Sequence, residues 1–228
     1  MTGNLESLLL VARCLADLRE QLVFVGGSVL ELLISDPAQP PVRPTLDVDL
    51  VVGAHSWIEF TRQQEKLREL GFREDPNGPI CRWNIEGVAV DLMPAEEEVQ
   101  GYITNRWYAA ALRTAEIMVL EGLEIKVISA PCFLATKLEA FDGRGERDFM
   151  ASHDLEDLVA VVDGREELAE EVARSEPELR EYLASRLRCL LDERDFIDAL
   201  PGHLFHDQAG QARLPLVLER LGRMAAPA

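Results

Sequence analysis

The hydrophobic pattern of this chain changes near residue 130, and the change limits the folds open to it. Before that point, short apolar runs with a period of two alternate with helical runs, whereas beyond it apolar residues recur only at helical spacing. Strands confined to one half and helices filling the other are typical of an α+β fold. The sequence therefore predicts a mixed sheet with flanking helices in one domain, residues 1–128, and an all-helical C-terminal domain, residues 129–228.

Turn residues and prolines divide the chain into individual elements. In the first part we expect helices at 4–20 (capped by Asn4), 26–34 and 56–70, strands at 22–25, 46–52 and 72–74, and hairpins at 81–93 and 115–128. Glu86-Gly87 and Glu121-Gly122 are the predicted hairpin turns. In the second part, helices are predicted at 130–141, 152–163, 165–173 and 177–192, and after Leu214.

Composition narrows the function classes. The net charge of −18 disfavours nonspecific binding of nucleic acid through overall charge, and residues 151–200 carry half of that excess. The four cysteines form no CxxC pair, which indicates reduced thiols rather than a zinc site. No signal peptide and no apolar run of about 18 residues is visible, so we expect a cytoplasmic protein without a membrane partner.

Two aspartates interrupt the apolar strand predicted at 46–52. Asp47 and Asp49 are two residues apart, so their side chains point to the same face of the strand, while Val48 and Leu50 point to the other. Like charges placed side by side repel unless a cation lies between them, and hard carboxylate oxygens suit Mg²⁺ or Mn²⁺. The alternative is that both carboxylates simply face water at a sheet edge.

A third aspartate and a glycine-rich turn strengthen the metal interpretation. Asp91 interrupts the second strand of the first hairpin, and if that strand lies beside Asp47 and Asp49, three carboxylates converge and suffice for two metal ions. Upstream, Gly26 and Gly27 permit close backbone approach, and Ser28 opens a helix whose N-terminus would attract phosphate. An ordinary tight turn with a serine cap is the alternative.

The order of these residues resembles the DNA polymerase beta-like nucleotidyltransferase superfamily. A strand leads into Gly26, Gly27 and Ser28, and about twenty residues later comes the run R-x-T-x-D-x-D-L, whose named members are Arg43, Thr45, Asp47 and Asp49. The form "RPTLDVDL" is similar to the AbiEii/AbiGii abortive-infection toxins, a group that includes the MenT toxins. Downstream, Lys137 followed by Asp154 or Asp157 also resembles that family, so the resemblance covers roughly residues 20–165.

The resemblance implies a nucleotidyltransferase-type fold and a metal-dependent mechanism. An NTP would bind at Gly26, Gly27 and Ser28 with Arg43 and Thr45 nearby, and Mg²⁺ or Mn²⁺ would be held by Asp47, Asp49 and Asp91. Asp91 would help to deprotonate an acceptor hydroxyl that attacks the α-phosphate. Lys137 would neutralise the leaving pyrophosphate, with Asp157 as the late aspartate, or Asp154 in its place.

The residues alone leave several of these roles open. Lys137 also fits an ordinary solvated position on an amphipathic helix, and Asp154 and Asp157 also fit the acidic first turn of a helix capped by Ser152. His153 at that helix start is more typical of a structural hydrogen bond than of a general base. Three aromatic residues could stack on a base but are more typical of a core: Trp83, Trp107 and Tyr108.

The resemblance leaves three hypotheses for function. The first is a toxin of a toxin–antitoxin or abortive-infection system that transfers NMP to the 3′ end of tRNA, with an antitoxin protein as partner. The second is transfer to a protein or small-molecule hydroxyl, and the third is a catalytically silent binding module with the same fold. RNA binding needs basic surface, for which the sequence offers a thin set: Arg82, Arg106, Arg113, Arg144 and Arg147.

Overall fold

The structure, a computed structural model, describes residues 3–96, 99, 105–144 and 147–226. Contacts between residues group the chain into two compact units. The first comprises Met1–Glu31 and Arg43–Ser129, and the second comprises Leu32–Val42 and Ala130–Ala228. The predicted division into folding domains at residues 128 and 129 stays a prediction.

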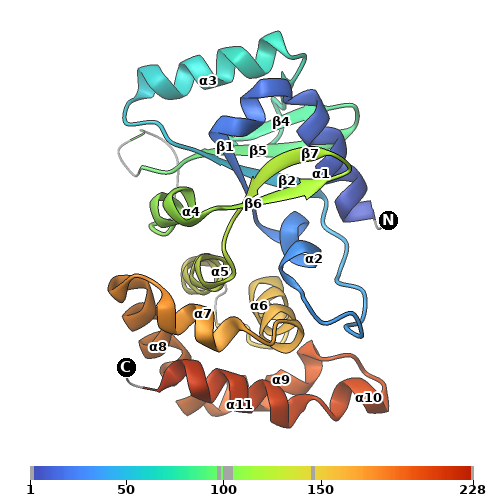
Figure 1. The fold of residues 1–228 in the computed structure, drawn as a ribbon, viewed down its shortest axis with the longest axis vertical. Coiled ribbons are helices and arrows are strands. Elements are labelled where there is room, and N and C mark those ends of the chain that lie inside the picture. The colour runs from blue at the N-terminus through green and yellow to red at the C-terminus, as the bar shows by residue number, and fades with distance from the viewer. Residues whose placement is uncertain (1–2, 97–98, 100–104, 145–146, 227–228) are drawn as a thin grey trace. The chain divides into compact units, whose positions relative to one another are not determined.

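The first unit is built on one seven-stranded mixed sheet (Figure 1). The strand order is β3-β4-β5-β2-β1-β7-β6. β2 runs parallel to β5, and β1 runs parallel to β7, while the other neighbours are antiparallel. The strands are β1 (Leu22–Val25), β2 (Asp47–Val52), β3 (Arg73–Glu74), β4 (Arg82–Ile85), β5 (Val88–Pro94), β6 (Glu116–Leu120) and β7 (Leu123–Val127).

Both predicted hairpins are confirmed, together with their turns. β4 pairs with β5 through Glu86 and Gly87, and β6 pairs with β7 through Glu121 and Gly122. All four turn residues have φ between 48° and 83°. Two successive residues with positive φ give the tight turn whose twist matches the strands it joins. The turn residues therefore fix the register of each hairpin.

The helices of the first unit differ more from expectation. The structure has α1 (Gly3–Cys14), η1 (Ala16–Gln21), η2 (Gly27–Val29), α2 (Leu30–Leu33), α3 (Trp57–Glu69) and α4 (Tyr108–Thr114). The single helix predicted over 4–20 is wrong, because Ala16 adopts a positive φ of 47° that no α-helix continues through. Asn4 lies within α1 rather than capping it, and α4 was not predicted.

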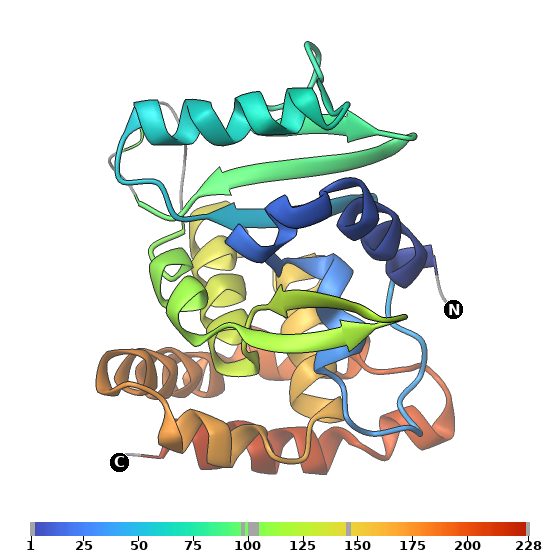
Figure 2. The same cartoon turned by 45° about the horizontal axis from the view of Figure 1, so that its top comes forward.

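Helices and sheet together bury an apolar core in the first unit. The face of β2 opposite its aspartates contributes Val48 and Leu50, both fully buried beside Phe24 and Val90. α1 packs against β2, β5 and β7, and α4 packs against β1 and β2. In both views α3 lies at the β3-β4-β5 side of the sheet (Figures 1 and 2). The aspartate-bearing face is thus supported by a closely packed layer.

In the described residues, the second unit holds helices and no strand, as predicted. Its helices are α5 (Ala130–Arg144), α6 (His153–Gly164), α7 (Leu168–Arg174), α8 (Pro177–Asp192), α9 (Arg194–His203), α10 (Gln208–Gln211) and α11 (Leu214–Ala225). α9 and α10 were not predicted, and Pro201 lies inside α9. Among the helices of the described ranges, none combines the length and apolarity that crossing a bilayer requires.

Candidate functional site

One row of facing residues crosses four strands of the sheet. Arg82 on β4 faces Asp91 on β5, Asp91 faces Asp49 on β2, and Asp49 faces Val25 on β1. Residues paired in this way project to the same face, and Asp47, two residues before Asp49, projects there too. The prediction that the strand of Asp91 lies beside the strand of Asp47 and Asp49 is therefore confirmed. The fold brings three carboxylates onto one face.

The carboxylate of Asp49 lies against the backbone of Gly26. Gly26 has φ +69°, and a Cβ atom built on it would stand 1.9 Å from Asp49 Oδ2. Any side chain at this position would collide with the carboxylate and would also be strained by the positive φ. The first glycine of the turn is thus required by the position of the aspartate beside it.

The second glycine lies beside the segment that leads into β2. A Cβ atom on Gly27 would stand 3.3 Å from Thr45 Oγ1 and 3.4 Å from a guanidinium nitrogen of Arg43. The Thr45 hydroxyl donates a hydrogen bond to Asp47 Oδ1 at 3.1 Å. Gly27, Arg43 and Thr45 are therefore neighbours, as the sequence motif implied, and Thr45 orients the first aspartate.

Asn4 fixes this segment from α1. Its side-chain nitrogen donates to the Arg43 carbonyl oxygen at 3.0 Å, and its side-chain oxygen accepts from the Thr45 backbone N–H at 2.9 Å. Only 4% of Asn4 is exposed. No sequence pattern links residues about forty positions apart, which is why this contact was missed.

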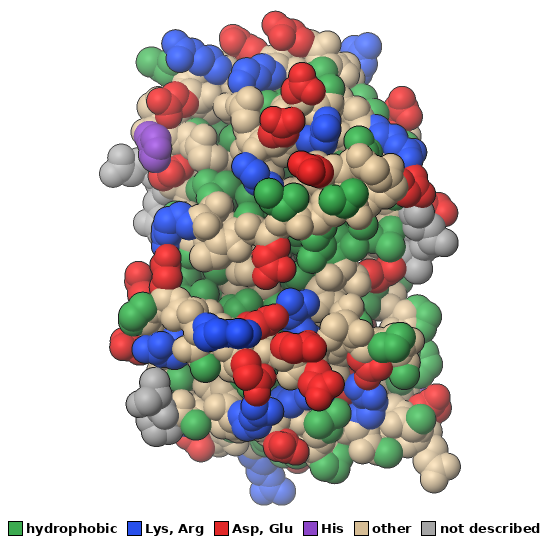
Figure 3. Space-filling model, viewed as in Figure 1, with side chains coloured by type: hydrophobic (Ala, Val, Ile, Leu, Met, Phe, Trp, Pro, Cys, Tyr) green, Lys and Arg blue, Asp and Glu red, His purple; other side chains and the backbone are tan. Residues whose placement is uncertain are grey.

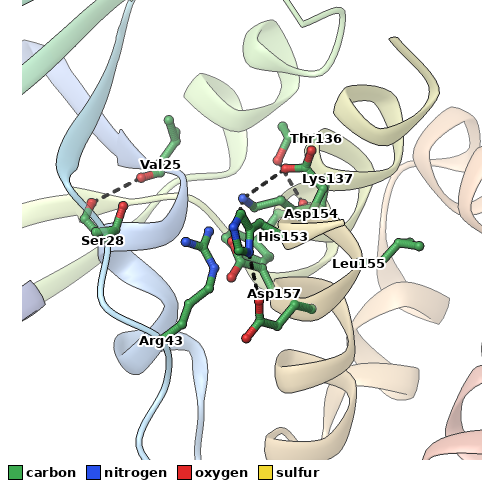
Figure 4. A network of polar contacts seen from close by, with 12 residues as sticks. Val25, Ser28, Arg43, Thr136, Lys137, His153, Asp154, Leu155 and Asp157 are labelled. Carbon is green, nitrogen blue, oxygen red and sulfur yellow. Dashed lines mark hydrogen bonds and ion pairs between the residues drawn. The ribbon is translucent and has the colours of Figure 1, made fainter. Parts of the chain in front are cut away.

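Ser28 is placed differently from the predicted helix cap. It lies inside the short turn η2, is fully buried, and its hydroxyl donates to the Val25 carbonyl oxygen at 3.4 Å (Figure 4). The predicted helix at 26–34 is only this turn followed by the single turn α2. The N-cap role is therefore wrong, because the hydroxyl is used to tie the turn back to β1.

Arg82, which the sequence suggested as an RNA contact, instead contacts two of the aspartates. Its Nε donates to Asp91 Oδ1 at 2.5 Å, and one terminal nitrogen donates to both Asp91 Oδ2 and Asp47 Oδ2 at 2.9 Å. The hydrogen bond to Asp91 raises the pKa of the guanidinium. Because the hairpin turns at Glu86-Gly87, simple counting would have placed residue 82 opposite residue 91.

The donor set fits a divalent cation in chemistry and topology. Three carboxylates project from one face of adjacent strands, and the carboxylate of Asp49 lies against the side-chain-free backbone of Gly26. Carboxylate oxygens are the ligands that Mg²⁺ and Mn²⁺ prefer. Among the described residues, no three acidic, histidine or cysteine side chains are gathered closely enough to hold an ion as they stand, and Arg82 contacts two of the three aspartates.

The second unit places Lys137 between two aspartates (Figure 4). Its ammonium lies 2.7 Å from Asp157 Oδ2 and 3.3 Å from Asp154 Oδ1. Lys137 is only 7% exposed, and the Asp157 side chain is fully buried. The interpretation of Lys137 as an ordinary solvated lysine is therefore wrong. Asp154 and Asp157 both contact it, so the choice between them is not an exclusive one.

The remaining candidates fall into core and surface positions. Trp83 is fully buried and Trp107 nearly so, while Tyr108 donates to the Met93 sulfur. Ser152 caps α6 as predicted, and exposed His153 contacts Glu156.

The arginines proposed for RNA contact are only partly available. Arg106, Arg113 and Arg147 are exposed, and Arg147 forms a surface ion pair with Glu193, whereas the mostly buried Arg82 is held by two aspartates. The side chain of Arg144 lies outside the described residues. On the face shown in Figure 3, basic and acidic side chains are interspersed. The surface therefore offers scattered positive charge.

Several solved structures are similar to this chain. The antibiotic-resistance factor ANT(2″)-Ia is 19% identical with a TM-score of 0.48, over 83% of this chain and 97% of its own. An antigenic nucleotidyltransferase-like protein from Paracoccidioides brasiliensis is 22% identical with a TM-score of 0.45, over 86% and 92%. JHP933 from Helicobacter pylori is 15% identical with a TM-score of 0.45, over 99% and 91%.

Among curated proteins, no relative matches. A protein-family model, by contrast, matches residues 8–223, which is nearly the whole chain. The matched family is described as the nucleotidyl transferase AbiEii toxin of a type IV toxin–antitoxin system, and membership implies an NTP substrate and an antitoxin partner. The chain belongs to the AbiEii nucleotidyltransferase toxin family.

Proposed function

We propose that the protein transfers NMP from an NTP to an acceptor hydroxyl in a metal-dependent reaction, as the toxin of a toxin–antitoxin or abortive-infection system. The observation that carries the proposal is the carboxylate row, in which Asp49 faces Asp91 and Asp47 stands two residues along the same strand. This row adjoins Gly26, whose missing side chain lets the carboxylate of Asp49 lie directly against the turn.

The chain's own residues divide the work of transfer in this proposal. The Gly26-Gly27 turn, with Arg43 and Thr45 beside it, receives the triphosphate, because backbone without side chains and a guanidinium both suit phosphate oxygens. Asp47, Asp49 and Asp91 hold Mg²⁺ or Mn²⁺. When bound, the ion stabilises negative charge on the transferred phosphate and on the leaving pyrophosphate.

The proton balance of the step involves Asp91. The acceptor oxygen forms a bond to the α-phosphorus, the bond between the α- and β-phosphates breaks, and pyrophosphate departs with the bonding electrons. The acceptor proton passes to the Asp91 carboxylate, which is only 11% exposed in its side chain and so is shielded from bulk water. Roles for Lys137 and Asp157 in transfer stay predictions.

The first acceptor to test is the 3′ end of tRNA in the cytoplasm, since the family resemblance includes toxins that act there. A protein or small-molecule hydroxyl is the second candidate, and a specific observation favours it. Among the arginines expected to contact RNA, Arg82 is held by Asp47 and Asp91, and the net charge of the chain is −18. Polyanion binding requires such arginines to be available.

Label transfer separates these acceptors. Purified protein is incubated with each labelled NTP, Mg²⁺ and total tRNA, and then with a cell extract in place of tRNA. Label in RNA supports the first acceptor, and label in protein or in small molecules supports the second. Asp47→Ala must abolish any signal. Absence of label with every NTP and both acceptor pools would favour the silent binding module and overturn the proposal.

A further inference from the structure

Arg82 lies at the β4 end of the carboxylate row and is the cation that contacts two of its aspartates, Asp47 and Asp91. Its guanidinium contacts both oxygens of Asp91 and one oxygen of Asp47, at distances of 2.5 Å and 2.9 Å. The Arg82 side chain is 22% exposed, and those of Asp91 and Asp47 are 11% and 28% exposed. The paired hydrogen bonds to Asp91 are charge-assisted and bidentate, a combination that is among the stronger hydrogen-bonding arrangements in proteins.

The fork leaves the carboxylate oxygens poorly available to a second cation. Asp47 accepts from Arg82 through one oxygen and from the Thr45 hydroxyl through the other, while both Asp91 oxygens face Arg82. A guanidinium stays charged at any physiological pH, so its repulsion of a metal ion cannot be removed by loss of a proton. A dication bound to the same oxygens would be repelled by it at close range.

The stem of Arg82 is held in place by the turn before β4. The Arg82 backbone N–H donates to the Pro79 carbonyl oxygen, and its carbonyl oxygen accepts from Asp75. A Cβ atom on Gly78 would stand 2.8 Å from Arg82 Cγ, so the turn packs directly on the stem. The guanidinium can therefore move by rotating its outer bonds while its base remains fixed.

We infer that Arg82 is a positioning residue of the transfer site: it holds Asp47 and Asp91 together as an internal counterion, and it must release them before a divalent cation binds. This inference rests on the metal-dependent reaction proposed above. Arg82 keeps the carboxylates from repelling one another in the metal-free protein. The same contact lowers the apparent metal affinity, because only molecules in which Arg82 has released them are competent to bind.

Binding of Mn²⁺ alone to the full chain tests the inference. Isothermal titration calorimetry compares wild type with Arg82→Met, which keeps an unbranched apolar stem without the guanidinium, and with Arg82→Lys, which keeps the charge without the fork. We expect the Mn²⁺ dissociation constant of Arg82→Met to fall about tenfold. Arg82→Lys should lie between Arg82→Met and wild type. Arg73→Met, an exposed arginine on the neighbouring strand β3, is the matched control and should bind as wild type does.

Melting temperature provides a readout that does not depend on activity. Without metal, Arg82→Met should melt below wild type because the carboxylates then repel, and Mn²⁺ should raise its melting temperature more than that of wild type. If wild type binds Mn²⁺ and Arg82→Met binds it no more tightly, the inference is overturned while the proposed function stands. If neither protein binds Mn²⁺, the inference fails together with the metal-dependent step.

Discussion

Each unit places one basic side chain between two aspartates, but the two clusters differ in how far they are exposed to solvent. In the first unit Arg82 lies between Asp47 and Asp91 on one face of the sheet, and their side chains are 11–28% exposed. In the second unit Lys137 lies between Asp154 and Asp157 inside a helical core, where the side chains are 0–9% exposed. Partial exposure lets one cation be exchanged for another, whereas burial makes loss of either partner costly. We therefore expect the first cluster to govern activity and the second to govern stability.

The largest expected effect is on activity in the first cluster. Asp91→Asn should lower the rate of nucleotidyl transfer by about 10²–10⁴-fold, the usual contribution of a proton-accepting group. The fold should change little, because the amide keeps the shape of the carboxylate and Arg82 retains Asp47. Single-turnover label transfer measures the rate, and circular dichroism verifies the fold. Transfer at the wild-type rate would remove Asp91 from the reaction.

The next effect is on stability in the second cluster. Lys137→Met leaves the fully buried carboxylate of Asp157 without its cation, and loss of one partner from a buried pair costs about 3–5 kcal/mol. Urea denaturation measures the free energy of unfolding. The double variant Lys137→Met/Asp157→Leu removes both charges and should recover part of the loss.

Lys66→Met, at an exposed lysine on α3, is the matched control and should stay within about 0.5 kcal/mol of wild type. A loss below about 1 kcal/mol for Lys137→Met would place this lysine among surface ion pairs. The contrast between the two clusters would then fail.

The sequence predicted the strands and the hairpins because both depend on local signals. Alternating apolar residues identify β2 and β5, and the two-residue turn fixes the register of β4 against β5. The direct facing of Asp49 and Asp91 depends in addition on the register of β2 against β5, which local signals do not set. The helix boundaries that were predicted wrongly depend on backbone conformations for which the sequence has no strong local signal. Ala16 ends a helix by adopting positive φ, although alanine is the best helix former.

Contacts between residues far apart in the chain could not be predicted from local sequence patterns. Its sequence position predicts that Asn4 caps a helix. In the structure, the side-chain nitrogen and oxygen of Asn4 both form hydrogen bonds to the segment before β2. Burial of Lys137 was equally hidden, since its helix position fits a solvated lysine as well as a buried one. The contacts and burial of such side chains depend on how distant elements pack together, and local propensity carries no information about that packing.

Asn4 therefore gives a third and smaller prediction for the first cluster. Asn4→Ala removes two hydrogen bonds to the backbone, which should cost about 1–3 kcal/mol of stability. Since Thr45 orients Asp47, the Mn²⁺ dissociation constant should rise as well. Asn4→Asp keeps the acceptor for the Thr45 N–H but sets a carboxylate oxygen against the Arg43 carbonyl oxygen in a site that is 4% exposed, so it should lower stability at least as much as Asn4→Ala. Unchanged Mn²⁺ binding in Asn4→Ala would limit Asn4 to a structural role.

The smallest expected effect reports the negative potential of the carboxylate row. Burial, and then the charge of Asp91, raise the pKa of the Cys81 thiol to about 11. Only the thiolate reacts with iodoacetamide, so alkylation of Cys81 should be slow at pH 8 and should accelerate about tenfold per pH unit until the pH reaches that pKa. Exposed Cys189 provides the internal comparison, and peptide mass spectrometry follows both sites. Asp91→Asn removes one of the charges that oppose the thiolate, so it should lower this pKa and speed alkylation at pH 8. An unchanged rate would mean that burial alone suppresses the thiolate, and that the potential of the row is already cancelled by Arg82.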